Sequence, residues 1–330
     1  MFQFDNKNKR KDKMNLKKIF LSSKLVIVLT ALLFPFTFET QAKDKSFDLS
    51  KPVLIRPFGD SITYGFGFTD WGFCPVYPIG QFICMPPNQA VGGYRVWMTE
   101  FAITNKALTF ATEGYQSGGS NIQQWITNTQ THDGYPGWRN DQLLQIANYP
   151  SFADITLVHA GTNDLIQGKS PNNAIIDLFK VVNALLANNS RTQIFLAKII
   201  RISPTAATKL PNYETLSKNI RDYNQLIDTY WINTIPALRS RITLVDMHPI
   251  LNLPEDYFDD VHPSPLGYMK ISCTWINAIK SQKTNPSDPC SGIETDNIKA
   301  KILPSEQDIK KMQPTDEELD KVLNGKFEFK

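Results

Sequence analysis

Ser61 and His262 are the two side chains of this sequence whose types and surroundings most strongly suggest chemistry. Ser61 follows an apolar run in Gly59-Asp60-Ser61, and a serine hydroxyl becomes a useful nucleophile only when a base takes its proton. His262 lies three residues after Asp259 in a Pro-flanked loop, so one short turn can carry the base and the carboxylate that orients it. Asp260 competes for the carboxylate role on sequence alone. The spacing predicts a relay from Ser61 through His262 to an aspartate.

A relay of this kind also needs hydrogen-bond donors for the negative charge that develops on a carbonyl oxygen. The side-chain amide of Asn163, in Gly161-Thr162-Asn163-Asp164, can supply one donor. The backbone N–H groups of Ser61 and of Gly137, in Gly134-Tyr135-Pro136-Gly137-Trp138, can supply two more. Each segment alone is also explained as an ordinary turn or helix cap, and it is their combination, in this order, that indicates acyl transfer.

The other three histidines fit structural roles better. His159 falls within an apolar run and is expected to be a core residue, and His248 precedes a proline in a loop. His132 lies just ahead of the second segment and is a candidate to line the site. The sequence contains no Gly-x-Ser-x-Gly elbow, which argues against the ordinary α/β-hydrolases, and no dinucleotide-binding fingerprint.

The four segments resemble blocks I, II, III and V of the SGNH hydrolases, also called the GDSL esterase/lipase superfamily. Residues 132–138, with Gly92-Gly93-Tyr94-Arg95 upstream, further resemble the carbohydrate esterase branch that includes acetylxylan esterases. Gly118-Gly119 is a second candidate for the block II glycine, but Gly137 is preferred because the flanking His, Pro and Trp also match.

The resemblance implies a flavodoxin-like sheet, and we expect an enzyme that needs no cofactor and no metal. It implies Ser61 as nucleophile, Gly137 and Asn163 in the oxyanion hole beside the Ser61 N–H, and Asp259 with His262 completing the triad.

Apolar runs alternate with helical patterns along the middle of the chain, which predicts a three-layer α/β/α sandwich. The five expected strands of a parallel sheet are 52–58, 108–111, 154–160, 192–199 and 242–247. The expected helices are 94–104, 139–147, 172–188, 213–233 and 266–281. Ligands of such sheets gather where loops leave the carboxyl ends of strands. Ser61 follows the first expected strand, Asn163 the third, and His262 lies in the loop after the last.

Three regions lie outside this alternation, so the sequence divides into a leader over 1–42, one catalytic domain over 43–290 and a charged tail over 291–330. An insertion over 66–92, rich in aromatic residues, Pro and Gly, lies beside Ser61 within the domain. It contains the aromatics expected at the rim of the site, which could stack on sugar rings, line an acyl groove or simply pack the loop. They are Phe66, Phe68, Trp71 and Tyr77, with Trp138 from outside the insertion.

The leader has the three-part layout of a secretory signal peptide. A basic stretch precedes an apolar run, Leu25 to Phe38, that is shorter than the roughly 20 residues that cross a bilayer. Thr40-Gln41-Ala42 supplies a cleavage site, although an uncleaved anchor and a start at Met14 stay open. The sequence therefore predicts export to the periplasm or the exterior, with no stable membrane anchor after cleavage. No pattern indicates an oligomeric state.

The leader also accounts for the basic balance of the chain. The whole chain carries +3 and residues 1–42 carry +5, so the rest is at about −2. Nucleic-acid binding, which needs a concentrated basic surface, is therefore not expected.

Four cysteines in an exported chain are expected to form disulfides. Of the three pairings, the local one is favoured, Cys74 with Cys84 and Cys273 with Cys290. Zinc is the competing use, but the cysteines lack the usual close Cys-x2-Cys spacing.

From the resemblance we expect a secreted serine esterase that removes small acyl groups such as acetate, with an acylated carbohydrate as substrate. One alternative keeps the triad and acts on lipid, as a lipase, lysophospholipase or acyltransferase. Another is an exported glycan-binding module that retains the fold without turnover.

Overall fold

The computed structural model describes Leu49 and residues 51–66, 92–105, 108–117, 131–282 and 285–293. The leader, nearly all of the insertion and most of the charged tail lie outside these residues, and so do Gly118-Gly119. The predictions made for them stay predictions. Among the described residues, none of the helices combines the length and apolarity needed to cross a membrane.

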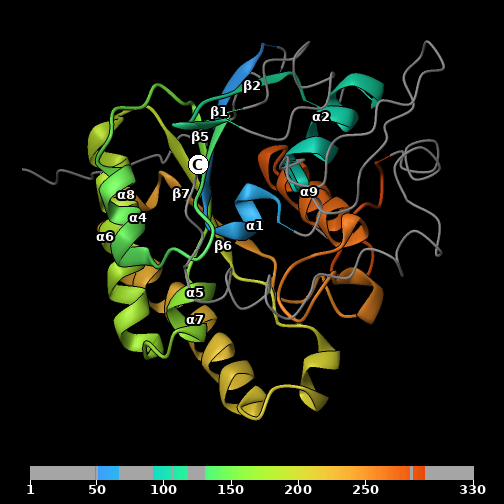
Figure 1. Ribbon diagram of the computed structural model, residues 1–330. Coiled ribbons are helices and arrows are strands. Elements are labelled where there is room, and N and C mark those ends of the chain that lie inside the picture. The colour runs from blue at the N-terminus through green and yellow to red at the C-terminus, as the bar shows by residue number, and fades with distance from the viewer. Residues whose placement is uncertain are drawn as a thin grey trace, which may run out of the picture. The chain divides into compact units, whose positions relative to one another are not determined.

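A single sheet organises the described part of the chain (Figure 1). The strands run in the order β3-β4-β1-β5-β6-β7, and β2 pairs with β1 beside β4. All neighbouring strands are parallel except β3, which is antiparallel to β4. Their bounds are β1 Val53–Gly59, β2 Phe110–Thr112, β3 Gln116–Ser117, β4 Thr131–Gly134, β5 Ile155–His159, β6 Gln193–Lys198 and β7 Ile242–Asp246.

The five predicted strands are present as β1, β2, β5, β6 and β7, but five is the wrong count, because β3 and β4 extend the same sheet. β2 pairs only with the first half of β1, at Val53 to Ile55. The second half of that edge is therefore open to β4, which pairs Gly134 with Gly59. β4 reads Thr-His-Asp-Gly, so no apolar run marked it as a strand.

Buried polar contacts stabilise β4 in place of apolar ones. The Arg56 Nε atom donates to Asp133 Oδ2 at 2.6 Å, and both side chains are buried. A second Arg56 nitrogen donates to the Ile146 carbonyl at 3.1 Å, while the Tyr115 N–H donates to Asp133 Oδ1 at 2.9 Å. Because charge is buried only when it is paired and hydrogen-bonded, this pair lets a polar strand lie next to the central one.

Helices cover both faces of the sheet, as predicted for a three-layer α/β/α sandwich. Alternate residues of a strand point to opposite faces: in β6, Phe195 and Ala197 face one core, and Ile194 and Leu196 face the other. α2 and α9 pack on the first face, and α4, α6 and α7 pack on the second (Figure 1). The helices are α1 Ser61–Tyr64, α2 Tyr94–Asn105, α4 Asn140–Ala147, α5 Thr162–Ile166, α6 Pro171–Asn188, α7 Tyr213–Asn233, α8 Pro236–Arg239 and α9 Pro265–Ile279, with short 3-10 turns η1 Pro204–Thr208 and η2 Pro254–Asp256.

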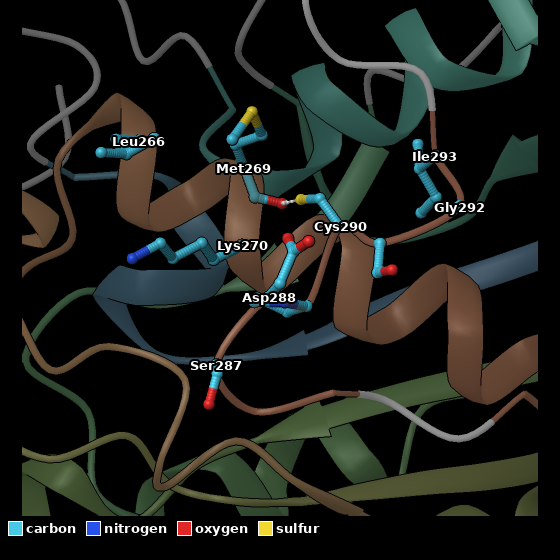
Figure 2. Close-up of a pocket in the computed structure, with 10 residues that line it drawn as sticks. Leu266, Met269, Lys270, Ser287, Asp288, Cys290, Gly292 and Ile293 are labelled. Carbon is cyan, nitrogen blue, oxygen red and sulfur yellow. Dashed lines mark hydrogen bonds between the residues drawn. The ribbon is translucent and has the colours of Figure 1, made fainter.

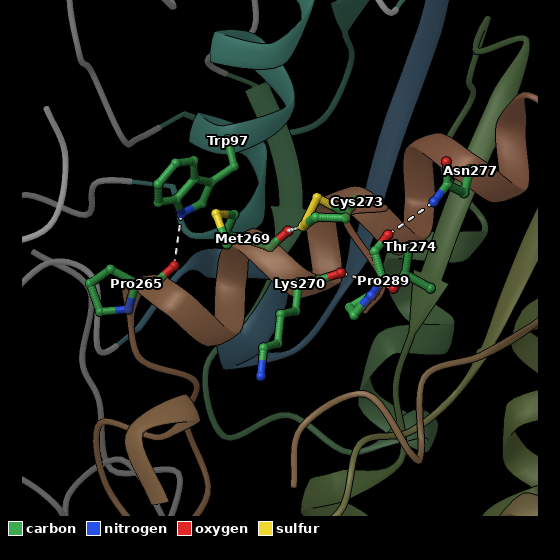
Figure 3. The surroundings of a disulfide bond; sticks show 9 residues. Trp97, Pro265, Met269, Lys270, Cys273, Thr274, Asn277 and Pro289 are labelled. Carbon is green, nitrogen blue, oxygen red and sulfur yellow. Dashed lines mark hydrogen bonds between the residues drawn. A yellow bond between two sulfur atoms is a disulfide. The ribbon is translucent and has the colours of Figure 1, made fainter. Parts of the chain in front are cut away.

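The chain after α9 is tied back to that helix by the predicted disulfide between Cys273 and Cys290, whose Cα atoms lie 5.0 Å apart. The side-chain amide of Asn277 donates to the Pro289 carbonyl at 2.9 Å, one residue from the bridge (Figure 3). Cys74 and Cys84 lie outside the described residues.

Candidate active site

Three strand ends in register bring three of the motif segments to one edge of the sheet. Gly59, at the end of β1, pairs with Gly134 of β4 on one side and with His159 of β5 on the other. Ser61 follows Gly59 by two residues, Gly137 follows Gly134 by three and Asn163 follows His159 by four. The three groups therefore leave the carboxyl edge of the sheet side by side, where ligands of parallel sheets bind.

Close backbone approach explains the glycines at these strand ends. A Cβ atom on Gly59 would lie 2.1 Å from the His159 carbonyl oxygen, and one on Gly134 would lie 2.3 Å from the Tyr64 nitrogen. Neither contact can be relieved by moving a flexible side chain, since both partners are backbone atoms. Larger residues here would push the nucleophile segment away from its neighbours.

Ser61 is the first residue of α1, and Asp60 is the N-cap of that helix. Asp60 Oδ1 accepts from the Ile62 N–H at 3.0 Å, which fixes the turn that presents the serine. Complete burial raises the pKa of Asp60 to about 7 from 3.8, although the Ile62 N–H and His262 oppose the rise. The N–H of Ser61 belongs to the first turn, where backbone donors have no partner within the helix.

Arg95 supports α1, the helix that begins with Ser61. It is 1 % exposed, and its guanidinium donates to the carbonyls of Thr63 and Tyr64 at 3.4 Å each. Gly93 lies so close to Gly65 that an added Cβ would be 2.7 Å from the Gly65 Cα atom. The segment Gly92-Gly93-Tyr94-Arg95 therefore packs against α1 and fixes its C-terminal end.

His262 connects the serine to a carboxylate. Its Nε2 atom lies 2.9 Å from Ser61 Oγ, and its Nδ1 atom lies 2.7 Å from Asp259 Oδ2. Asp259 Oδ1 accepts from the N–H groups of Val261 and His262, at 2.6 Å each. Burial opposes ionisation of Asp259, but the histidine and these donors outweigh it and hold its pKa below the ordinary value. An ionised Asp259 selects the tautomer with a proton on Nδ1, which leaves Nε2 to accept the serine proton.

The structure also separates the two candidate carboxylates. The Asp260 side chain lies 3.3 Å from Lys209 Nζ, and its carbonyl accepts from the Ser203 N–H at 2.8 Å. Asp260 thus joins the histidine loop to the chain after β6, and Asp259 alone of the two contacts His262.

The prediction that Phe66 lies at the exposed rim of the site is wrong, because the residue is buried against His262. Its ring is 6 % exposed and lies 4.5 Å from the His262 ring, centre to centre, while its carbonyl accepts from the Tyr268 hydroxyl at 2.6 Å. Packing against the imidazole buries it, so it restrains the base. Trp138 is half-buried and stacks on Tyr135 at 4.5 Å. Phe68, Trp71 and Tyr77 lie outside the described residues.

Gly137 lies in a tight turn from Tyr135 to Trp138. Pro136 occupies the second position, Gly137 has a φ of +76°, and the Trp138 N–H donates to the Tyr135 carbonyl at 3.2 Å. These are the marks of a type II turn, which requires glycine at its third position. The turn's own hydrogen bond uses the N–H of Trp138, which leaves the N–H of Gly137 for another acceptor.

Asn163 is 5 % exposed on α5, and its side-chain nitrogen donates to the Trp138 carbonyl at 3.1 Å. A primary amide has two N–H groups, so one holds the turn and the second is left for a substrate oxygen. The side chain therefore connects α5 to the turn that contains Gly137.

A buried network holds the segment before α5. The Tyr223 hydroxyl donates to the Ala160 carbonyl at 3.0 Å and accepts from the Asn140 amide at 3.1 Å. The N–H of Asn140 donates to Asp164 Oδ2 at 2.8 Å. Gly161 must be glycine here, since an added Cβ would lie 2.3 Å from the tyrosine oxygen. Sequence reasoning missed these contacts, because their partners lie on three different elements.

The remaining histidines serve the fold. His132 is fully buried on β4, where its Nδ1 accepts from the Gly134 N–H at 3.0 Å and burial lowers its pKa well below the ordinary value. It therefore supports the strand and does not line the site. Burial also lowers the pKa of His159 to about 4, as fits the predicted core residue. His248 contacts the Asn224 amide at 3.1 Å.

Among the described residues, one group of acidic side chains is close enough to share a metal ion: Asp141, Asp164 and Asp177. The ammonium group of Lys169 already lies among them, at 2.7, 2.7 and 3.0 Å. The lysine supplies the positive charge that these carboxylates need, so the group fits an ion-pair cluster better than a metal centre.

A cavity of about 390 Å³ lies between the first half of α9 and residues 287–293 (Figure 2). Leu266, Met269 and Lys270 of α9 line it, together with Ser287 and Asp288 from the segment after that helix. None of its lining residues belongs to the serine–histidine–aspartate relay, so this cavity is not the place where Ser61 would meet a substrate.

Comparison with known proteins identifies the family. Residues 58–270 match the GDSL-like Lipase/Acylhydrolase family, a range that contains all four motif segments. The chain is 26 % identical over 270 residues to a multidomain esterase of Ruminococcus flavefaciens. That match covers 73 % of this chain and 31 % of the relative, so the chain spans about a third of the length of the curated protein it matches.

Solved structures with similar folds include carbohydrate esterases. A family 3 carbohydrate esterase from Talaromyces cellulolyticus is 20 % identical, with a TM-score of 0.49, over 70 % of this chain and 100 % of that one. A family 3 carbohydrate esterase from Clostridium thermocellum is 19 % identical, with a TM-score of 0.48, over 70 % of this chain and 98 % of that one. Because the family model matches residues 58–270, more than half of the chain, those residues form a carboxylic ester hydrolase domain and the chain belongs to the GDSL-like lipase/acylhydrolase family.

Proposed function

We propose that this protein is an exported serine esterase that removes small acyl groups, acetate above all, from carbohydrate. The observation that carries the proposal is the continuous relay from Ser61 Oγ to His262 Nε2, at 2.9 Å, and from His262 Nδ1 to Asp259, at 2.7 Å. Such a relay activates a serine for attack on an ester carbonyl.

In the first half of the reaction, Ser61 Oγ attacks the ester carbonyl carbon as its proton passes to His262 Nε2. Asp259 stabilises the imidazolium that forms, because its carboxylate is ionised and held in place by two backbone donors. The carbonyl oxygen becomes an oxyanion facing the N–H groups of Ser61, Gly137 and Asn163. The alcohol then leaves with the proton from His262, and the acyl group stays on Ser61.

In the second half, a water molecule replaces the alcohol. His262 takes its proton as the oxygen attacks the acyl carbon, the oxyanion forms again at the same donors, and the acid leaves as the proton returns to Ser61. Because these donors are fixed before the substrate arrives, stabilising the oxyanion requires little rearrangement.

Two observations favour a small acyl group on a sugar. Ser61 and Asn163 are 4 % and 5 % exposed, and Phe66 packs on the imidazole, so little room surrounds the nucleophile. The segments 132–138 and 92–95 also match the carbohydrate esterase branch, and the similar proteins named above include carbohydrate esterases.

The test combines active-site labelling with substrate profiling. A fluorophosphonate probe should label Ser61, while the peptide with Ser264, a buried serine that caps α9, stays unlabelled. Wild-type protein should hydrolyse p-nitrophenyl acetate and acetylated xylan oligosaccharides and leave p-nitrophenyl palmitate and phospholipid intact. A preference for palmitate and phospholipid would move the substrate to lipid. Glycan binding with no labelling would indicate a binding module.

Export is part of the same proposal and rests on the three-part pattern of residues 1–42. N-terminal sequencing of the protein recovered outside the cytoplasm should begin at Lys43. A mature chain that retains the apolar run from Leu25 to Phe38 would contradict cleavage and would indicate a membrane anchor.

A further inference from the structure

Gln167 ends α5 on the same face as Asn163, four residues earlier. The N–H of Gln167 donates to the Asn163 carbonyl at 3.0 Å, so both residues belong to one helical turn. Residues four apart on a helix are neighbours on its surface. The two side-chain amides therefore point in a common direction, toward the turn that contains Gly137.

The two amides bind consecutive carbonyl groups of that turn. Gln167 Nε2 donates to the Gly137 carbonyl at 2.8 Å, and Asn163 Nδ2 donates to the Trp138 carbonyl at 3.1 Å. The position of the turn relative to α5 is thus set by a pair of hydrogen bonds, one from each amide.

Arg139 holds the other end of the Gln167 amide. Its Nη1 atom donates to Gln167 Oε1 at 2.8 Å, and its Nε and Nη2 atoms donate to the two oxygens of Asp141, at 3.0 Å each. Because the amide is held at both ends, its nitrogen must face the Gly137 carbonyl. The guanidinium is occupied by these contacts, so Arg139 is a support and not a substrate ligand.

Gly137 needs such a support more than its neighbours do. Glycine is the residue with the greatest backbone freedom, and the φ of +76° is one that only glycine adopts readily. Rotation about the backbone bonds of Gly137 would move its N–H relative to its carbonyl. The hydrogen bond from Trp138 to the Tyr135 carbonyl closes the turn, and the bond from Gln167 holds the Gly137 carbonyl. Because both sides of Gly137 are held, these two bonds together limit rotation at Gly137 and so restrain the direction of its N–H.

We propose that Gln167 is a positioning residue for the oxyanion hole: it orients the Gly137 N–H through the Gly137 carbonyl, and Asn163 completes the same set of bonds. The proposal rests on the proposed function, because it concerns a donor used only when an oxyanion forms. Gln167 does not touch the substrate. Its effect appears in the transition state and not in the binding of the ground-state ester.

The sharpest variant is Gln167→Glu, which keeps the acceptor for Arg139 and removes the donor to the Gly137 carbonyl. Gln167→Met, of similar length, removes both hydrogen bonds. Gln167 is exposed, so neither change disturbs the core. One hydrogen bond changes an equilibrium by roughly tenfold at most. We therefore expect kcat on p-nitrophenyl acetate to fall about tenfold in each variant, with KM changed by less than about twofold.

A second readout separates positioning from a general structural effect. A small boronic acid forms a negatively charged adduct on the serine, and its inhibition constant should rise by the same factor as kcat falls. The matched control is Asn188→Leu, which removes a side-chain amide that donates to the carbonyls of Ala147 and Ala184 away from the site. That variant should keep the wild-type kcat and inhibition constant.

The outcomes are distinguishable from failure of the proposed function. A wild-type protein with no esterase activity, or a Ser61→Ala variant as active as wild type, would remove the proposed function itself. An active wild type with both Gln167 variants within twofold of its kcat would overturn the positioning role alone. So would a fall in kcat that follows a lowered unfolding temperature, or a boronic acid affinity that does not change.

Discussion

The buried carboxyl group of Asp60 should make the free energy of unfolding of this protein depend on pH. Its side chain is 0 % exposed, Oδ1 accepts from the Ile62 N–H, and Oδ2 has no hydrogen-bond partner among the described residues. Burial without full hydrogen bonding disfavours the charged form. That cost is why the pKa of Asp60 is raised to about 7.

The sign and the size of the effect follow from linkage. The unfolded chain releases this proton near 3.8, whereas the folded chain holds it until about pH 7. Between these values the folded state binds more protons, so the free energy of unfolding falls as pH rises. From pH 5 to pH 8.5 the loss due to Asp60 is about 3 kcal/mol, since each unit of pKa corresponds to about 1.4 kcal/mol.

Asp60→Asn should remove this loss while it keeps an oxygen for the Ile62 N–H. Urea unfolding with the disulfides intact, at pH 5 and at pH 8.5, measures the difference between variant and wild type. The free energy of unfolding of the variant, minus that of wild type, should be larger by about 3 kcal/mol at pH 8.5 than at pH 5. The same replacement of a carboxylate by an amide at the exposed Asp288, Asp288→Asn, serves as the matched control. An Asp60→Asn advantage that is equal at both values, or larger at pH 5, would refute the reasoning.

Three further sets of substitutions test the oxyanion donor Asn163, the carboxylate of the relay and the disulfide between Cys273 and Cys290. Asn163→Ala should lower kcat by about 10²–10³-fold, the usual loss for one oxyanion donor, and an unchanged kcat would remove Asn163 from that role. Asp259→Asn should lower kcat by about 10⁴-fold without unfolding the protein, because the amide favours the wrong tautomer of the imidazole; pH-rate profiles and circular dichroism check both parts. Cys273→Ser with Cys290→Ser should lower the free energy of unfolding by about 3 kcal/mol, given the sequence separation of 17 residues, and urea unfolding that shows no loss would contradict a stabilising bridge.

The strands that could be predicted from the sequence are those that bury both faces. β5 and β6 each contain a run of apolar residues, and every residue of the two strands except Lys198 is buried. β4 could not be predicted in the same way, because it is kept at the edge of β1 by the ion pair between Arg56 and Asp133 across 77 residues. Such partners come together only in the folded chain, so the hydrophobic periodicity of the sequence cannot predict them.

The choice between Asp259 and Asp260 shows the same limit at the site. Both lie within reach of His262 along the chain, and both precede the same proline. What separates them is a contact with another part of the chain: Ser203 binds the carbonyl of Asp260, and Lys209 binds its side chain. Spacing predicted that one aspartate would hold the imidazole, but the packing of the loop decides which one.

The proposed oxyanion hole depends on a turn and a helix that no short motif connects. Tyr135-Pro136-Gly137-Trp138 predicts its own type II geometry, since Pro and Gly fill the two central positions. The direction in which that turn faces is set from α5, by Asn163 and Gln167. A chain could keep all four motif segments and still lose catalytic rate if position 167 carried no donor. The segments that resemble the family therefore predict which atoms react, whereas the rate depends on residues between and beside them.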